Sequence, residues 1–190
     1  MRISIVFFLA LFLGACSDNY TPKPRAFFKV DLPDKEYERI DIDCNFSFAK
    51  PIYGILRKIN QDCFYNLEFP NQNGVLHITY LPLKENLLEH IEESRSLAYK
   101  HDMMADAISE SVYINDEDKV YGLLYDYDGV TATATQFYLT DSTNHFFRGA
   151  LYLNTEVTDS LLPINNFLKE DVKHIIESFR WKSQQGTTSN

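Results

Sequence analysis

The chain has 190 residues and carries 18 basic against 27 acidic side chains, which gives a formal net charge of −9 at pH 7. An acidic protein of this kind repels a phosphate backbone, so the charge argues against nucleic-acid binding. The 12 tyrosines and 14 phenylalanines favour a packed core that contains β-structure, and they argue against a disordered chain.

The N-terminus has the organisation of an export signal. Arg2 precedes an apolar run over 3–13, which is shorter than the about 20 apolar residues of a membrane-spanning helix. Leucine, glycine and alanine then stand directly before Cys16, a pattern typical of bacterial lipoproteins, which are cleaved before a lipid-modified cysteine. We therefore predict that 1–15 is removed and that Cys16 carries the lipid, whose acyl chains (palmitate among them) hold the protein on a membrane. An ordinary cleaved signal that happens to contain a cysteine is the alternative.

The remaining chain divides into a tether, one domain and a tail. Residues 16–25 contain two prolines and no apolar pattern, which predicts an extended tether from the lipidated cysteine. Residues 183–190 are rich in serine, glutamine, glycine and threonine, which predicts a flexible tail. The segment 26–182 between them has the length of a single domain.

Cys44 and Cys63 are the two cysteines of the predicted domain. Because an exported chain meets an oxidising compartment, we predict that they form a disulfide that pins the first hairpin. Closing a loop of about 20 residues in this way stabilises a fold by roughly 3 kcal/mol. A catalytic cysteine or a metal-binding pair is the alternative, but neither a CxxC spacing nor a neighbouring histidine supports it.

Alternating apolar residues predict three strands early in the domain, over 44–48, 63–69 and 75–80, arranged as an antiparallel meander. Helical spacing then predicts an amphipathic helix from Lys84 to about Met104, which covers one face of the sheet. Four further strands, separated by turn sequences, are predicted over 109–115, 119–127, 132–140 and 145–153. A closing helix over 163–179 completes an α+β fold, a single domain with an antiparallel β-sheet covered by amphipathic helices.

Motifs that carry chemistry are few. The histidines are scattered without metal-ligand spacing, and no glycine-rich phosphate loop is present, so we expect no metal and no cofactor other than the covalent lipid on Cys16. Asp141, Ser142 and His145 cluster in a predicted turn and raise the possibility of a hydrolase. A GxSxG nucleophile motif is missing, however, and these residue types are common in turns. We predict that the protein is not an enzyme.

Five cationic side chains form a candidate interaction surface. Arg95, Lys100 and His101 lie along the first predicted helix, and His145 and Arg148 lie on the last predicted hairpin among aromatic residues. The alternative is that the aromatic residues belong to the core and that the cations balance the acidic protein locally.

A set of motifs is distributed over nearly the whole chain. They are the lipoprotein signal, Tyr20-Thr21-Pro22-Lys23-Pro24-Arg25, Asp31-Leu32-Pro33, the cysteine pair, Ser94-Arg95, Leu97-Ala98-Tyr99-Lys100-His101, Tyr121-Gly122-Leu123-Leu124-Tyr125-Asp126, Gln136-Phe137-Tyr138-Leu139-Thr140-Asp141-Ser142, His145-Phe146, Arg148-Gly149-Ala150-Leu151-Tyr152 and Arg180-Trp181-Lys182. Together these motifs resemble the gliding motility lipoprotein GldD family of the Bacteroidota. The resemblance implies a cell-envelope lipoprotein required for gliding, in a system that links motility to type IX secretion. It implies no enzymatic activity and assigns the lipid to Cys16. The order of strands and helices also resembles the Mog1/PsbP type of domain.

Two functions follow as expectations. The first is a non-catalytic subunit or assembly factor of the gliding and type IX secretion apparatus, anchored in the outer membrane and facing the periplasm, with other proteins of that apparatus as partners. Ser17 after the lipidated cysteine is compatible with outer-membrane sorting. The second is a periplasmic module that binds peptidoglycan, glycan or lipid, which predicts an apolar pocket with convergent polar groups.

Overall fold

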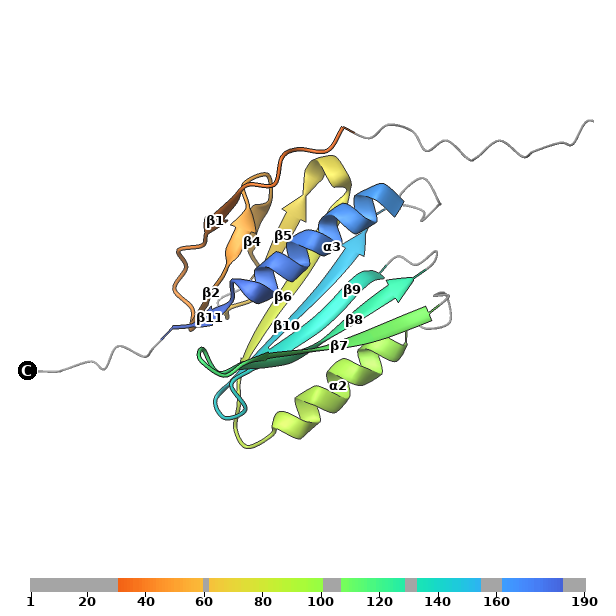
Figure 1. Cartoon of the computed structure of the whole chain (residues 1–190). Helices are drawn as coiled ribbons and strands as arrows, with labels where there is room; N and C mark the ends of the chain where they lie inside the picture. The colour runs from red at the N-terminus through yellow and green to blue at the C-terminus, as the bar shows by residue number, and fades with distance from the viewer. Residues whose placement is uncertain (1–30, 60–61, 101–106, 129–132, 155–161, 183–190) are drawn as a thin grey trace, which may run out of the picture.

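The computed structural model describes residues 31–59, 62–100, 107–128, 133–154 and 162–182 (Figure 1). The predicted signal peptide, lipid site, tether and tail lie outside these residues, as does His101. Within the described part of the chain, no helix is both long enough and apolar enough to cross a membrane.

A seven-stranded antiparallel sheet forms the centre of the domain, with the strand order β4-β5-β6-β10-β9-β8-β7. Its strands are β4 (Ile55–Lys58), β5 (Tyr65–Phe69), β6 (Gly74–Pro82), β7 (Ala107–Asn115), β8 (Val120–Asp128), β9 (Thr133–Thr140) and β10 (His145–Leu153). The last four are joined in chain order, as their turn sequences predict. Of these four strands, the first, β7, lies at one edge of the sheet, and the last, β10, pairs with β6.

The start of the domain differs from the predicted meander. The pattern over 44–48 predicts a strand next to β5, and this prediction is wrong. Instead β2 (Phe46–Ser47) pairs with β11 (Arg180–Trp181), β1 (Tyr37–Arg39) pairs with β3 (Ala49–Pro51), and β4 lies beside β5. The alternation around Phe46 and Phe48 reflects burial of both rings, which are 0% exposed. Burial of alternate side chains does not identify the strand that pairs with them.

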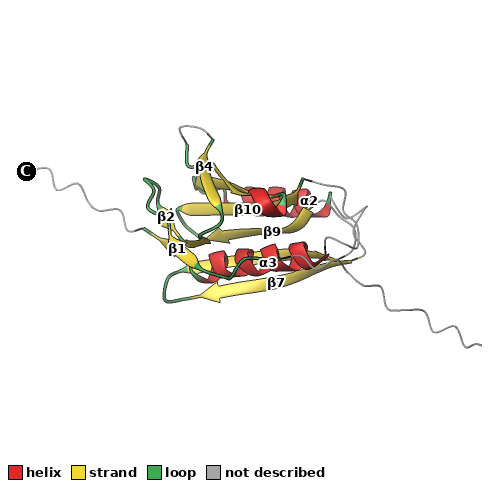
Figure 2. Ribbon diagram, turned by 90° about the horizontal axis from the view of Figure 1, so that it is seen from above, coloured by secondary structure: helices red, strands yellow, loops and turns green. Residues whose placement is uncertain are grey.

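Two helices lie on opposite faces of the sheet (Figure 2). The helix α3 (Leu162–Glu177) buries Leu168, Val172 and Ile175 at helical spacing against the larger core. The helix α2 (Leu87–Tyr99) buries only Ser94 and Ala98, and it packs on tyrosines of β8. Because neighbouring residues of a strand point to opposite faces, each central strand contributes to both sides. A short 3₁₀ helix, η1 (Pro70–Gln72), joins β5 to β6.

The predicted α+β domain with an antiparallel sheet and covering helices is confirmed.

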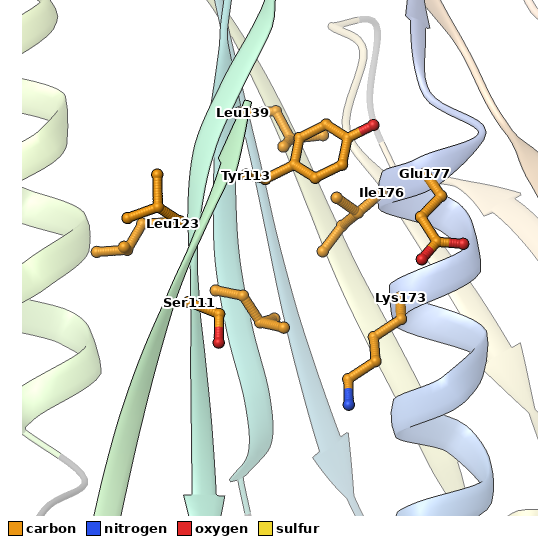
Figure 3. Close-up of a pocket in the computed structure, with 9 residues that line it drawn as sticks. Ser111, Tyr113, Leu123, Leu139, Lys173, Ile176 and Glu177 are labelled. Carbon is orange, nitrogen blue, oxygen red and sulfur yellow. The ribbon is translucent and has the colours of Figure 1, made fainter. Parts of the chain in front are cut away.

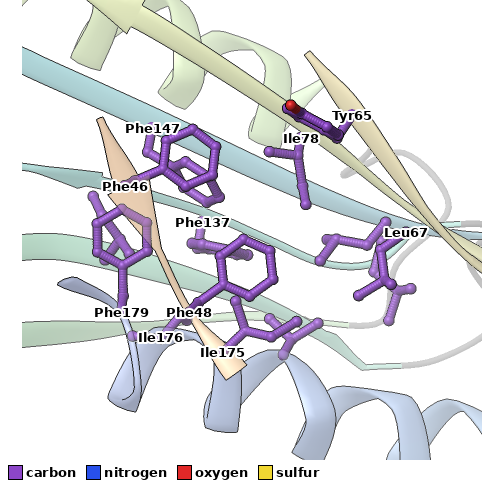
Figure 4. Packing of buried hydrophobic residues seen from close by; sticks show 14 of the residues in the cluster. Phe46, Phe48, Tyr65, Leu67, Ile78, Phe137, Phe147, Ile175, Ile176 and Phe179 are labelled. Atoms are coloured by element: carbon purple, nitrogen blue, oxygen red, sulfur yellow. The ribbon is translucent and has the colours of Figure 1, made fainter. Parts of the chain in front are cut away.

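The core on the α3 side is rich in phenylalanine (Figure 4). Phe147 lies with its ring centroid 4.9 Å from that of Phe46 and 4.8 Å from that of Phe179. Burial of each such ring contributes roughly 1.5–3 kcal/mol. Gly149 leaves the space that the Phe137 ring fills across the strand pair, because a Cβ at this glycine would lie 2.3 Å from the ring.

Asp171 on α3 holds the first described residues of the domain. Its carboxylate is fully buried and lies 2.7 Å from Lys35 Nζ, and it accepts hydrogen bonds from the hydroxyls of Tyr37 (3.0 Å) and Tyr53 (2.7 Å). Burial, and then the hydrogen bond to this carboxylate, raises the pKa of both tyrosines above the ordinary value. Lys35 also lies 3.5 Å from the centroid of the Phe167 ring. These contacts tie β1 and the turn after β3 to the helix.

Cys44 and Cys63 are joined by a disulfide, with the sulfurs 2.03 Å apart. Cys44 precedes β2 and is buried, whereas Cys63 precedes β5. The bond therefore links the loop before β2 to the main sheet, and it does not lie within a hairpin.

Candidate functional site

The strand β7 forms one edge of the main sheet. It pairs with β8 in continuous register from Ala107 opposite Asp128 to Asn115 opposite Val120. On its other side, no strand of the described chain pairs with it. An edge strand directs half of its backbone N–H and C=O groups away from its neighbour, and these groups can pair with a further strand.

The two edges of the sheet differ in the features that usually prevent pairing between proteins. The edge strand β4 has four residues, of which Arg57 and Lys58 are cationic, and Arg57 Nε lies 2.8 Å from a carboxylate oxygen of Glu68. In contrast, β7 has nine residues with no proline, no lysine or arginine and no register shift. Its Val112 and Ile114 side chains are 71% and 66% exposed. Natural edges are protected by charge, proline, bulges and short length, and of these features β7 has only a single charged residue, Glu110. We therefore describe β7 as an unprotected edge.

A cavity of about 200 Å³ lies between β7, β8 and α3 (Figure 3). It is lined by Ser111, Val112, Tyr113, Leu123, Leu124, Leu139, Lys173, Ile176 and Glu177. Tyr113 and Ile176 project toward each other from the strand and the helix, and the charged ends of Lys173 and Glu177 lie at the rim. An engineered apolar cavity of roughly 150 Å³ takes up a benzene ring. The cavity therefore has room for one aliphatic or aromatic side chain, and it is smaller than the roughly 300–1,000 Å³ of typical small-molecule sites.

Acidic side chains surround this edge. Glu110 lies on the α2 side of β7, where its carboxylate accepts a hydrogen bond of 2.7 Å from the hydroxyl of Tyr99. In the turn that follows β7, Asp116 and Glu117 are exposed, whereas Asp118 pairs with Arg180 at 2.9 Å. Together with Glu177 at the cavity, these groups give the edge a negative potential that Lys119 and Lys173 offset only in part.

The predicted interaction surface is divided by the sheet. Arg95 is exposed on α2 and Lys100 is exposed directly after the helix, and the guanidinium of Arg95 lies 5.8 Å from the centroid of the Tyr99 ring. Arg148 lies on the same side of the sheet, because it is paired with Tyr138 of the α2-side cluster. Its Nη2 donates to Gln136 Oε1 at 2.6 Å, and burial lowers the pKa of the guanidinium.

His145 lies on the opposite face, three positions along the same strand from Arg148. Its Nδ1 lies 2.7 Å from the hydroxyl of Tyr80, and its ring stacks on Trp181 with 5.1 Å between centroids. The structure therefore does not bring His145 and Arg148 into one surface, and His101 lies outside the described residues.

In the turn that raised the possibility of a hydrolase, the carboxylate of Asp141 has a structural role. One oxygen of Asp141 accepts the backbone N–H groups of Thr143 (3.0 Å), Asn144 (2.8 Å) and His145 (2.8 Å). Burial raises the pKa of Asp141, but these three hydrogen bonds and the electrostatic attraction of His145 together lower it more, and the net shift is downward. The backbone N–H of Ser142 donates to Thr140, and no hydrogen bond in the described part of the chain joins the Ser142 side chain to His145. The described residues likewise contain no group of three or more metal-ligating side chains.

None of the candidate site residues that we chose from the sequence lies on the free edge strand β7. A signal for it was present in the composition of 107–115, which combines two exposed residues of high β-propensity, Val112 and Ile114, with a single charged residue. In a paired inner strand such as β10, apolar residues occupy nearly every position.

Comparison with known proteins identifies a family. The sequence profile described as "Gliding motility lipoprotein GldD" matches residues 17–181, which is nearly the whole chain beyond the predicted signal. No curated protein matches the chain at a significant level. A lipoprotein family implies a chain that is associated with a membrane of the cell envelope through a lipid anchor. The extent of the match shows that the chain belongs to the gliding motility lipoprotein GldD family.

Proposed function

We propose that this lipoprotein is a non-catalytic subunit or assembly factor of the gliding and type IX secretion apparatus, anchored through Cys16 in the outer membrane and facing the periplasm. The observation that carries the proposal is the family match over 17–181. The anchor keeps the folded domain close to the membrane, where its contacts with other components of the apparatus are made.

The structure supports action through protein contacts. The unprotected edge β7 offers backbone groups for pairing, and the cavity beside it has the volume of one side chain. The carboxylates of Asp171 and Asp141, which are candidates for a catalytic role by residue type, have structural partners. Asp171 binds Lys35 and two tyrosines, and Asp141 binds the backbone of its own turn.

Replacement of the lipid-site cysteine tests the proposal. A strain with Cys16→Ala is expected to produce the folded domain, detected as a protein with no free thiol after export, and to lose spreading on agar. A Ser17→Ala strain is the matched control because it changes the next residue and leaves the lipid site intact. Normal spreading by the Cys16→Ala strain, with the protein released from the membrane, would contradict the proposal.

A ligand-binding module is the second candidate, and the apolar cavity with Lys173 and Glu177 at its rim is the observation that favours it. Its volume admits an acyl-chain end or a single ring, but not a whole disaccharide. Thermal-shift measurements with peptidoglycan fragments, glycans and lipids distinguish the two candidates. A shift that Lys173→Ala abolishes would favour ligand binding, and the absence of any shift would argue against it.

A further inference from the structure

We propose that β7 receives an extended segment of a partner protein as an eighth strand of the sheet, with one apolar side chain of that segment in the cavity between β7 and α3. The inference rests on the proposed function only in taking the partner to be a component of the same envelope apparatus. It is carried by the unprotected edge and by the cavity that opens directly beside it.

The backbone of β7 is suited to pairing over its whole length. Its register with β8 runs without a shift from Ala107 to Asn115, so the outward N–H and C=O groups follow the regular alternation of a ladder. Strand addition of this kind takes its affinity from main-chain hydrogen bonds and its specificity from pockets for alternate side chains.

The side chains on the two faces of β7 supply such specificity. Val112 and Ile114 project on the α2 side and are largely exposed, so they offer apolar contact to every second residue of an added strand. On the α3 side, Ser111 is small and leaves the cavity open toward the edge, while Tyr113 forms part of its wall (Figure 3). The remaining residues of an added strand point to this side, where one of them can enter the cavity.

Charge decides which occupant fits. In a symmetric antiparallel pair of β7 strands centred on Ser111, the two Glu110 carboxylates lie diagonally on one face, and like charges so placed repel. Each chain also carries a net charge of −9. A segment from another protein avoids this repulsion if it carries lysine or arginine next to Glu110 and beyond Asn115, where Asp116 and Glu117 are exposed. The expected occupant is therefore a neutral or basic strand with β-branched residues and one larger apolar side chain.

A defined peptide tests the inference on the mature lipidated protein in detergent micelles. The probe is a fluorescent peptide of alternating threonine and valine with one central leucine and a lysine at each end, and the comparison peptide has proline in place of the central leucine. We expect saturable binding of the first peptide by fluorescence anisotropy and at least about tenfold weaker binding of the second, because proline cannot donate to a ladder.

Variants of the edge locate the binding. The double change Val112→Lys and Ile114→Lys, at exposed positions, is expected to weaken binding by about tenfold or more, because charge on an edge strand opposes pairing and repels the lysines of the probe. Ser111→Trp, which fills the mouth of the cavity, is expected to weaken binding of the leucine peptide similarly. Ile55→Lys on β4 is the matched control, since it adds a lysine at a 43% exposed apolar position on the opposite edge. It should leave binding unchanged.

Three results would overturn the inference. The first is the absence of saturable binding, and the second is an equal loss of binding in the Ile55→Lys control. The third is a dimer in analytical ultracentrifugation that the double lysine change dissociates, because this would assign the edge to a second copy of the chain.

Spreading assays separate the inference from the proposed function. If the double lysine variant is exported, disulfide-bonded and supports normal spreading while Cys16→Ala does not, the proposed function stands and the role of β7 fails. If Cys16→Ala spreads normally, the proposed function fails, and the peptide measurements still decide whether β7 accepts a strand.

Discussion

Asp171 is expected to be among the most costly single residues to replace. Its carboxylate is fully buried, with Lys35 Nζ at 2.7 Å and the hydroxyls of Tyr37 and Tyr53 at 3.0 Å and 2.7 Å. Removal of one member of a buried ion pair costs about 3–5 kcal/mol. Lys35 retains 25% side-chain exposure and can turn partly toward water, so we expect Asp171→Ala to lower the free energy of unfolding by about 3 kcal/mol, the lower end of that range.

Thermal and denaturant unfolding of the mature protein measure this loss. A change of 1 kcal/mol lowers Tm by roughly 2–4 °C in a chain of this size, so Asp171→Ala should lower Tm by roughly 6–12 °C. Glu170→Ala is the matched control, because that neighbouring carboxylate is 69% exposed and lies 3.9 Å from the same lysine. It should change stability by less than about 1 kcal/mol. Equal changes in the two variants, or a decrease below about 3 °C for Asp171→Ala, would refute the reasoning.

Three further predictions concern other parts of the domain. Gly149→Ala places a Cβ 2.3 Å from the Phe137 ring, so we expect a loss of about 1–3 kcal/mol in urea unfolding, and an unchanged midpoint would contradict the packing described. Replacement of both Cys44 and Cys63 by alanine removes the disulfide and should cost roughly 3 kcal/mol, while alkylation of the unreduced wild type should detect neither thiol. Asp141→Ala should cost about 1–2 kcal/mol at pH 7. Because the folded pKa of Asp141 is lowered, its stabilisation is complete above the unfolded pKa of 3.8 and is lost as the pH falls through the folded pKa, so wild type and variant should converge in acid.

Periodicity in the sequence predicts those strands and helices in which buried side chains recur at a regular spacing. Phe147 and Leu151 of β10 face α3, and Val172 and Ile175 of α3 repeat at helical spacing, so strand and helix are both evident from sequence. The pairing of β2 with β11 is not evident. Those two strands have two residues each and lie more than 130 positions apart in the chain, and what joins them is the packing of Phe46 on Phe179. Tertiary contacts of this kind leave no local pattern to detect.

The sequence also indicates why β7, and not β10, lies at the edge of the sheet. The turns predict an antiparallel meander of β7, β8, β9 and β10, in which only the first or the last strand can pair with β6. Because this sheet carries a helix on each face, a central strand is buried on both of its faces. The strand β10 has apolar or small residues at most positions, whereas β7 has Ser109, Glu110 and Ser111 in succession before Val112. The more apolar end of the meander therefore pairs with β6, in a register that brings Phe147 opposite Tyr80 and Leu151 opposite Leu76. Since this pairing excludes β7 from the centre, the same composition that stabilises the core also leaves a nine-residue strand available to a partner.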